Sequence, residues 1–76
     1  AKIHISCLDT AGVLNDIADI ISKNNVNIID VSTDVVEGGL ANIWIICKVK
    51  SKEKLDFVIN DILKIKNVDS VQRVHE

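Results

Sequence analysis

The hydrophobic pattern begins with a strict alternation at the amino end of the chain. In residues 2–7, Ile3, Ile5 and Cys7 fall on one face and polar side chains fall on the other. A period of two residues is typical of a strand with one buried face. The sequence therefore opens with a predicted half-buried strand.

A helical period follows from Gly12. Apolar side chains recur there at positions i, i+3, i+4 and i+7, which predicts an amphipathic helix that packs through one stripe. Asp9 or Thr10 can cap its first turn, and the polar run at residues 23–25 is expected to end it. The predicted stripe is Leu14, Ile17, Ala18 and Ile21.

The middle of the chain is predicted to form a hairpin. Residues 27–36 and 40–50 both alternate as strands do, and the adjacent Gly38 and Gly39 tolerate the positive φ that a tight turn needs. On one side of the first strand we expect Ile29, Val31, Thr33 and Val35. In the second strand we expect Ile43, Ile45, Cys47 and Val49 on one face, and Asn42, Trp44, Ile46 and Lys48 on the other.

A second helix and a last strand complete the pattern. Ser51 is a predicted N-cap, and the apolar stripe that follows it has helical spacing. Residues 68–74 are predicted as a short edge strand, whose valines three residues apart indicate a bulge. The helical stripe consists of Leu55, Val58, Ile59 and Ile62, together with Leu63 or Ile65.

The order of elements, βαββαβ, predicts the fold class. With short connections and right-handed crossovers, two βαβ units interleave as a four-stranded antiparallel sheet of order 4-1-3-2 with both helices on one face. This is an α+β sandwich of the ferredoxin-like type. If Ile5 lies opposite Ile45, then Cys7 and Cys47 are separated by about four residues of strand, or about 13 Å. That separation is too large for a disulfide.

Length and composition narrow the possibilities. The 76 residues allow one domain, and 47% apolar residues with a formal net charge of -2 are typical of a folded domain without a basic nucleic-acid surface. Because the chain starts with Ala1 and has no Met, we expect residues 1–76 to be a single domain cut from a longer protein. No apolar run of about 18 residues and no leader-like segment occurs. We therefore expect no membrane partner, no direct DNA binding and a cytoplasmic location.

Catalytic and metal chemistry find no support in the pattern. Cys7 and Cys47 do not form a CxxC, and no His stands at metal-ligand spacing from either, so we expect neither a metal nor another cofactor. Neither His4 nor His75 belongs to a set of nucleophile, base and orienting group. Trp44 is the one aromatic ring predicted on the open sheet face, which disfavours RNA binding of the RRM type. We expect no catalytic residue in this chain.

A more specific signal lies at residues 9–14. Their sequence, DTAGVL, resembles the DRPGLL element of ACT domains, small regulatory modules that bind amino acids between paired copies. Fifteen residues beyond Gly12, the pair Asn27-Ile28 resembles the Asn-Ile pair that opens the second strand in that family. Thr10 and Ala11 stand where the family has Arg and Pro.

The rest of the chain extends this resemblance. Residues 40–43 and 68–74, LANI and VDSVQRV, are similar to the ATI strand and the terminal VxxVxRV of C-terminal ACT domains in RelA/SpoT-type (p)ppGpp synthetase/hydrolases. The resemblance implies a non-catalytic regulatory domain of a GTP pyrophosphokinase, whose nucleotide chemistry belongs to N-terminal domains. It implies that the domain relays amino-acid or ribosome status in the stringent response, as a homodimer or paired with another ACT domain.

Two roles are open for residues 9–14. In the first, an amino acid binds there: its carboxylate meets the amides of the helix start near Gly12, its ammonium group meets Asp9, and Asn27 of a partner copy bridges the two. In the second, Asp9 caps the helix, Gly12 permits a turn and Asn27 ends a loop. The ligand-binding set implied by the resemblance is Asp9, Thr10, Ala11, Gly12, Val13, Leu14, Asn27 and Ile28, of which Val13, Leu14 and Ile28 are expected to meet an aliphatic side chain.

The open face of the sheet is a second candidate surface. Trp44 and Ile46, with His4 and Ser6 beside them, are predicted on the side that no helix covers. We expect an interface there, with another ACT domain, other domains of the parent or the ribosome as the partners that the resemblance implies. The alternative is a Trp side chain that its neighbours shelter.

Two other functions stay open beside the RelA/SpoT-type hypothesis. One is an ACT domain of an amino-acid biosynthetic enzyme that senses its end product. The other is a pairing module without a ligand, which joins parent chains through the edge of the second strand.

Overall fold

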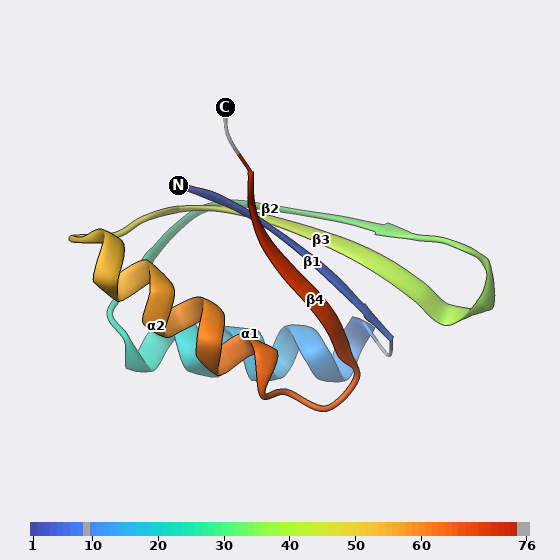
Figure 1. Cartoon of the computed structure of the whole chain (residues 1–76). Helices are drawn as coiled ribbons and strands as arrows, with labels where there is room; N and C mark the ends of the chain where they lie inside the picture. Colours follow the sequence, from blue (N-terminus) through green and yellow to red (C-terminus); the bar gives the residue numbers. More distant parts are fainter. Residues whose placement is uncertain (9, 75–76) are drawn as a thin grey trace.

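The chain forms one sheet with a helical layer on one face. In the computed structural model, which describes residues 1–8 and 10–74, both helices lie on the same side of the sheet (Figure 1). The strand order is β2-β3-β1-β4 with antiparallel neighbours, so the predicted ferredoxin-like βαββαβ sandwich is confirmed. The elements are β1 (Lys2–Leu8), α1 (Thr10–Lys23), β2 (Asn27–Val35), β3 (Leu40–Lys48), α2 (Lys52–Leu63) and β4 (Val68–Val74), with a 3-10 turn at Glu37–Gly39.

The core lies between the sheet and the helices and is aliphatic. Alternate residues of β1 and β3, the two central strands, point into it, which confirms the predicted strand faces. Among the described residues, no polar or charged side chain is buried with them. The buried set is Ile3, Ile5, Cys7, Val13, Ile17, Ile21, Ala41, Ile43, Ile45, Cys47, Leu55, Val58 and Ile62.

The first helix begins earlier than its apolar pattern predicted. Thr10 is already helical, so residues 10–14 of the ACT-like motif all belong to α1. Of the two predicted N-caps, Thr10 therefore lies within the helix, and Asp9 lies outside the described residues.

The buried stripe of α1 also differs from the predicted one. Val13, Ile17 and Ile21 face the core at successive i+4 steps, whereas Ala18 is exposed and Leu14 is only partly buried. Both sets have helical spacing, and Val13 joins the buried stripe because it lies four residues before Ile17. The larger valine buries more apolar surface than Ala18 would.

The register of the central strands differs by two residues from the one considered above. Ile5 lies opposite Ile43 rather than Ile45. A shift of two residues leaves every side chain on the same face of the sheet, so the alternation of the sequence does not distinguish the two registers.

The two cysteines consequently lie further apart than expected. Cys7 is opposite Ala41, whereas Cys47, at the far end of β3, exchanges two backbone hydrogen bonds of 2.8 Å with Ala1. Their separation along the strands is roughly 20 Å. The prediction that they do not form a disulfide with each other is unaffected.

Turns and caps follow the sequence closely. Gly38 and Gly39 both have φ of 81° in the hairpin, and the Ser51 hydroxyl accepts a hydrogen bond of 3.1 Å from the backbone N–H of Lys54 at the start of α2. Ile65, just beyond α2, packs against the core, whereas Leu63, the last residue of α2, is exposed.

Each edge strand contains a bulge. In β4 the register shifts next to Val68, as the valine spacing predicted. In β2, Ile28 lies opposite Cys47 and Asp30 opposite Ile46, so Ile29 is the extra residue. The predicted alternation from Ile29 is therefore wrong at its first position, because Ile28 takes the place on the helix-covered face.

Candidate functional site

The start of α1 holds most of the residues that the ACT-like motif singled out. Thr10 is partly buried, and Ala11 and Gly12 are exposed in the first helical turn. The first backbone N–H groups of a helix have no partner within it and lie at the positive end of its dipole. The exposed first turn therefore offers N–H groups that suit a carboxylate. Asp9, the predicted partner of an ammonium group, lies outside the described residues.

The predicted apolar contacts divide into two kinds. Val13 is only 1% exposed and packs in the core, so its side chain offers no surface to a ligand. Leu14 is partly buried, and Ile28 is 39% exposed. Of this set, Leu14 and Ile28 therefore have apolar surface that is open to solvent.

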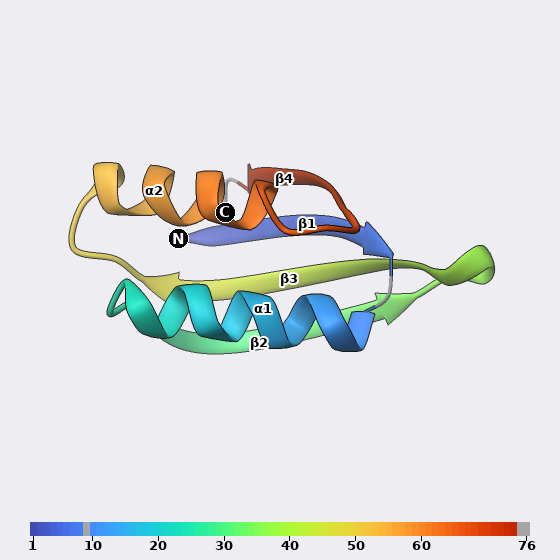
Figure 2. The ribbon, with the colours of Figure 1, turned by 90° about the horizontal axis from the view of Figure 1, so that it is seen from below.

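Asn27 and Ile28 lie at the other end of the domain from the start of α1. The helix has 14 residues and spans about 21 Å, and β2 begins only after its last turn. Figure 2 shows the start of α1 beside the end of β2, and the start of β2 beside the end of α1. One copy of the chain therefore does not bring the two parts of the motif together.

The outer edge of β2 is unpaired and exposed. The strand pairs only with β3, and all nine of its residues are exposed. Val31 lies at its centre and Asn27 at its start. Four large apolar side chains of this strand face solvent, namely Ile28, Ile29, Val31 and Val35.

The open face of the sheet holds the second candidate set. His4, Trp44 and Ile46 are each partly buried. The rings of His4 and Trp44 lie 5.2 Å apart between centroids, and His4 Nε2 lies 2.8 Å from Asn42 Oδ1. The neighbours of Trp44 thus shelter it in part, and the interface predicted on this face stays a prediction.

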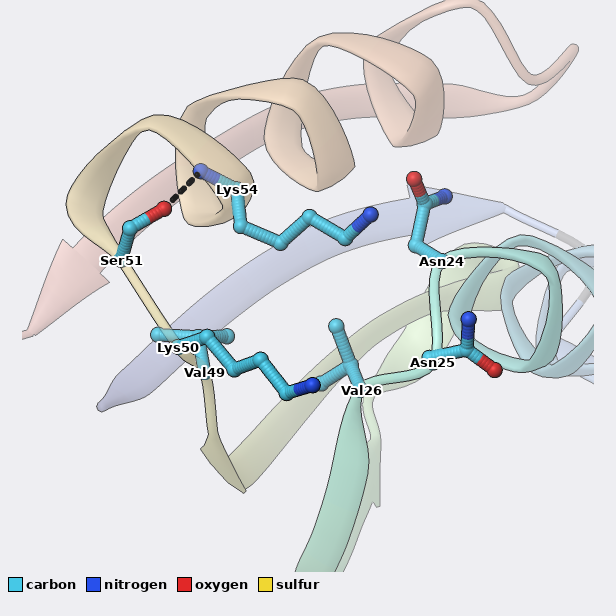
Figure 3. A pocket seen from close by; sticks show the side chains of 7 residues that line it. All are labelled: Asn24, Asn25, Val26, Val49, Lys50, Ser51 and Lys54. Atoms are coloured by element: carbon cyan, nitrogen blue, oxygen red, sulfur yellow. Dashed lines mark hydrogen bonds between the residues drawn. The ribbon is translucent and has the colours of Figure 1, made fainter.

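A hollow that the sequence reasoning missed lies between the α1–β2 turn and the start of α2. Its volume is about 190 Å³, and Lys50 and Lys54 extend across it toward the turn (Figure 3). The Asn24 side chain donates a 2.8 Å hydrogen bond to the Ile20 carbonyl at the end of α1. The signal that could have found this basic hollow is the run of alternate lysines from Lys50 to Lys54.

The Cys47 thiol has a shifted pKa. Burial raises the pKa of the Cys47 thiol above its ordinary value of 9.0, and the charge of the N-terminal amino group lowers it in part. A buried thiol with a raised pKa is a poor nucleophile, because the thiolate is the reactive form.

Within residues 1–8 and 10–74, no cluster of three or more His, Cys, Asp or Glu side chains could hold a metal ion. Within the same residues, neither helix is long and apolar enough to cross a bilayer.

The family model described as ACT domain matches residues 1–73. The chain belongs to the ACT domain family. It is therefore a regulatory rather than a catalytic domain, of a kind that commonly dimerises and binds amino acids.

Individual relatives agree with this assignment. The crystal structure of the ACT domain from the GTP pyrophosphokinase of Chlorobium tepidum is 28% identical, with 97% of this chain and 95% of that chain covered and a TM-score of 0.83. The acetolactate synthase small subunit of Thermotoga maritima shares the fold, with a TM-score of 0.78 at 18% identity over 93% of this chain and 44% of that chain.

A curated relative is longer than this chain. It is an ACT domain-containing protein of Fusobacterium nucleatum subsp. nucleatum, 26% identical over 73 residues, which are 93% of this chain and 48% of the relative. The chain thus spans about half the length of that protein.

Proposed function

We propose that this chain is the regulatory ACT domain of a RelA/SpoT-type GTP pyrophosphokinase, and that it relays amino-acid or ribosome status to catalytic domains of its parent. The likeness to the Chlorobium domain supports this parent, because it covers nearly all of both chains at 28% identity. The RelA/SpoT-like motifs at residues 40–43 and 68–74 support it independently.

The observation that carries the mechanism is the unpaired β2 edge together with the divided motif. Two copies that pair antiparallel along β2, with Val31 beside the partner's Val31, join their sheets into one of eight strands. In this arrangement the partner's Asn27 lies beside Val35, at the same end of the domain as the start of α1 (Figure 2). Pairing therefore brings together the two parts of the motif that a single copy keeps apart.

An amino acid would bind between the copies. Its carboxylate would meet the N–H groups of the first turn of α1, which Ala11 and Gly12 leave open to solvent. The amide of the partner's Asn27 would bridge to it with one donor and one acceptor. Because the ligand contacts both copies, it would bind the dimer more tightly than the monomer, and a coupling of about 1 to 3 kcal/mol would be passed to the parent.

The proposal is tested by following the amide signals of Gly12 and Val13 in NMR spectra while branched-chain amino acids, serine and phenylalanine are added in turn. Saturable shifts with one amino acid are expected. The absence of shifts at about 10 mM ligand, with dimerisation retained, would contradict amino-acid sensing and leave the pairing or ribosome-docking role.

Two asparagine variants make the titration specific. Asn27→Ala should weaken ligand binding at least about tenfold, because it removes the bridging amide. Asn60→Ala removes an exposed amide from α2 and should leave binding unchanged. For the parent, an HD hydrolase and a synthetase region encoded upstream are expected; a biosynthetic enzyme there would favour end-product sensing instead.

A further inference from the structure

The open sheet face carries an ordered arrangement of charges around an apolar centre. Across β1, β3 and β2, the side chains of Lys2, Ile46 and Asp30 form one row. Because neighbouring strands are about 4.8 Å apart, the backbones of Lys2 and Asp30 are about 10 Å apart with Ile46 between them. Within the described residues, neither Lys2 nor Asp30 has an ion-pair partner within 4.0 Å.

The same polarity recurs two rows further on. Ser6, Asn42 and Asp34 lie side by side there, so the row again has a donor on β1 and a carboxylate on β2. Between these rows, the ring of Trp44 lies against His4. The two outer rows thus have a donor on β1 and a carboxylate on β2, and the middle strand carries Ile46, Trp44 and Asn42.

This face is complementary to itself. A two-fold axis that runs along β3, midway between two facing sheets, exchanges the β1 side with the β2 side and keeps each row opposite its own copy. Lys2 then meets the partner's Asp30 and Ser6 meets the partner's Asp34, and each of these pairs forms twice. Ile46 and Trp44 meet their own counterparts at the centre.

The physical requirements of such a contact are met. Facing sheets pack about 10 Å apart with their strands nearly aligned, and a two-fold contact uses the same patch on both copies. A hollow of about 190 Å³ lined by Lys2, Asp30, Ser32, Trp44 and Ile46 leaves room for side chains of the second copy.

We propose that the open sheet face is a second self-association surface, in which two copies pack sheet against sheet through Trp44 and Ile46 and are aligned by reciprocal Lys2–Asp30 pairs. This contact is separate from the β2 edge of the proposed function, because it uses the face of the sheet and not its rim. A small ligand or an RNA on this face would be the alternative occupant.

Charge exchange tests this contact. Sedimentation equilibrium is measured on the chain carrying Val31→Lys, which is intended to remove the edge contact so that the face contact is observed alone. In this background Lys2→Glu or Asp30→Lys should weaken association at least about tenfold, because each creates two like-charge pairs. The double variant Lys2→Glu/Asp30→Lys should restore association to within about threefold, because the pairs form again with reversed polarity.

Matched controls exclude an effect of net charge. Lys52→Glu and Asp56→Lys make the same charge changes at exposed positions of α2 and should leave association unchanged. The proposal is overturned if the background chain shows no association up to about 1 mM, if the single exchanges have no effect, or if the double variant is as weak as the single ones. Failure of the edge contact would instead appear as an unchanged dimer when Val31→Lys is compared with the unmodified chain.

Discussion

The two edges of the sheet are built differently. Helix α2 packs against β4, and the valines of that strand are partly buried. By contrast, every residue of β2 is exposed, including four large apolar ones. Proteins usually protect an edge strand by shortening, covering or charging it, because open backbone groups recruit other strands. The open β2 edge, with four exposed large apolar side chains among its nine residues, supports the proposed pairing along this strand.

The largest effect is expected from placing a charge on β2. Val31→Lys would bring two ammonium groups side by side across the proposed two-fold, and like charges on opposed strands repel. We expect the dimer dissociation constant to rise at least about hundredfold, measured by sedimentation equilibrium. Phe57→Lys is the matched control, because Phe57 is 65% exposed on α2. Equal losses in both variants, or none in Val31→Lys, would contradict the pairing edge.

Truncating one valine on each edge strand tests the difference between β4 and β2. Val71→Ala on β4 should lower the free energy of unfolding by about 1 to 2 kcal/mol at any protein concentration, because the side chain packs on the core. Val31→Ala should cost less than about 0.5 kcal/mol in dilute protein. Its cost should grow as the concentration rises, because only the dimer buries that side chain. Urea unfolding at two concentrations measures both, and a Val31→Ala cost independent of concentration would contradict dimer burial.

The hairpin glycine tests how β2 is held. Gly38 has φ of 81°, and a Cβ there would meet no atom within 4 Å, so Gly38→Ala should destabilise through backbone strain alone, by about 1 kcal/mol. Hydrogen exchange should accelerate first at the Val35 and Val36 amides and not in β4. Gly12→Ala, at a helical position, should instead stabilise the fold. Faster exchange in β4 would show that the hairpin supports both edges.

The smallest effect on stability is expected from a change of pH. It acts through Cys47, near the end of β3, which pairs with Ile28 near the start of β2. Because burial raises the pKa of Cys47 in the folded chain, the folded state holds the thiol proton more tightly than the unfolded state does. The contribution of this group is present below pH 9.0 and is lost as pH rises through the folded pKa. Unfolding measured from pH 8 to about pH 10.5 should show a steeper loss of stability than Cys47→Ala does. Equal slopes of stability against pH in the two chains would contradict a raised pKa of Cys47 in the folded state.

The fold could be predicted from the sequence because the hydrophobic residues of each helix and strand recur with the period of that type of element. Local structure was specified by the alternation in β1 and β3, by the Ser51 cap and by the paired glycines. Short connections and right-handed crossovers then left one way to assemble these elements into a sheet. The register of β1 against β3 was not predictable in this manner. Pairing Ile5 with Ile43 instead of Ile45 leaves every side chain on the same face of the sheet. The early start of α1 was missed because its first turn, Thr10 to Gly12, carries no apolar residue that sets a period.

The candidate site was predictable only in part. The motif named the start of α1 and Asn27, and the resemblance implied that Asn27 comes from a partner copy. The structure adds that one copy places the two at opposite ends of the domain (Figure 2). Val13 was expected to meet a ligand and is instead in the core, because it lies four residues before Ile17 on the buried stripe of α1. The lysines that line the basic hollow are dispersed in a polar segment and acquire a common location only through the fold.

In the proposed dimer, antiparallel pairing along β2 brings the partner's Asn27 to the start of α1. The most direct test of this pairing is paramagnetic relaxation between copies. A chain without ¹⁵N that carries a nitroxide on Asn27→Cys is mixed with unmodified chain enriched in ¹⁵N. The nitroxide is expected to attach at position 27, because the thiols of Cys7 and Cys47 are buried. We predict broadening of the Ala11, Gly12 and Val13 amides of the labelled copy. Dimers in which these amides stay sharp while the amides at residues 27–29 broaden would contradict the account.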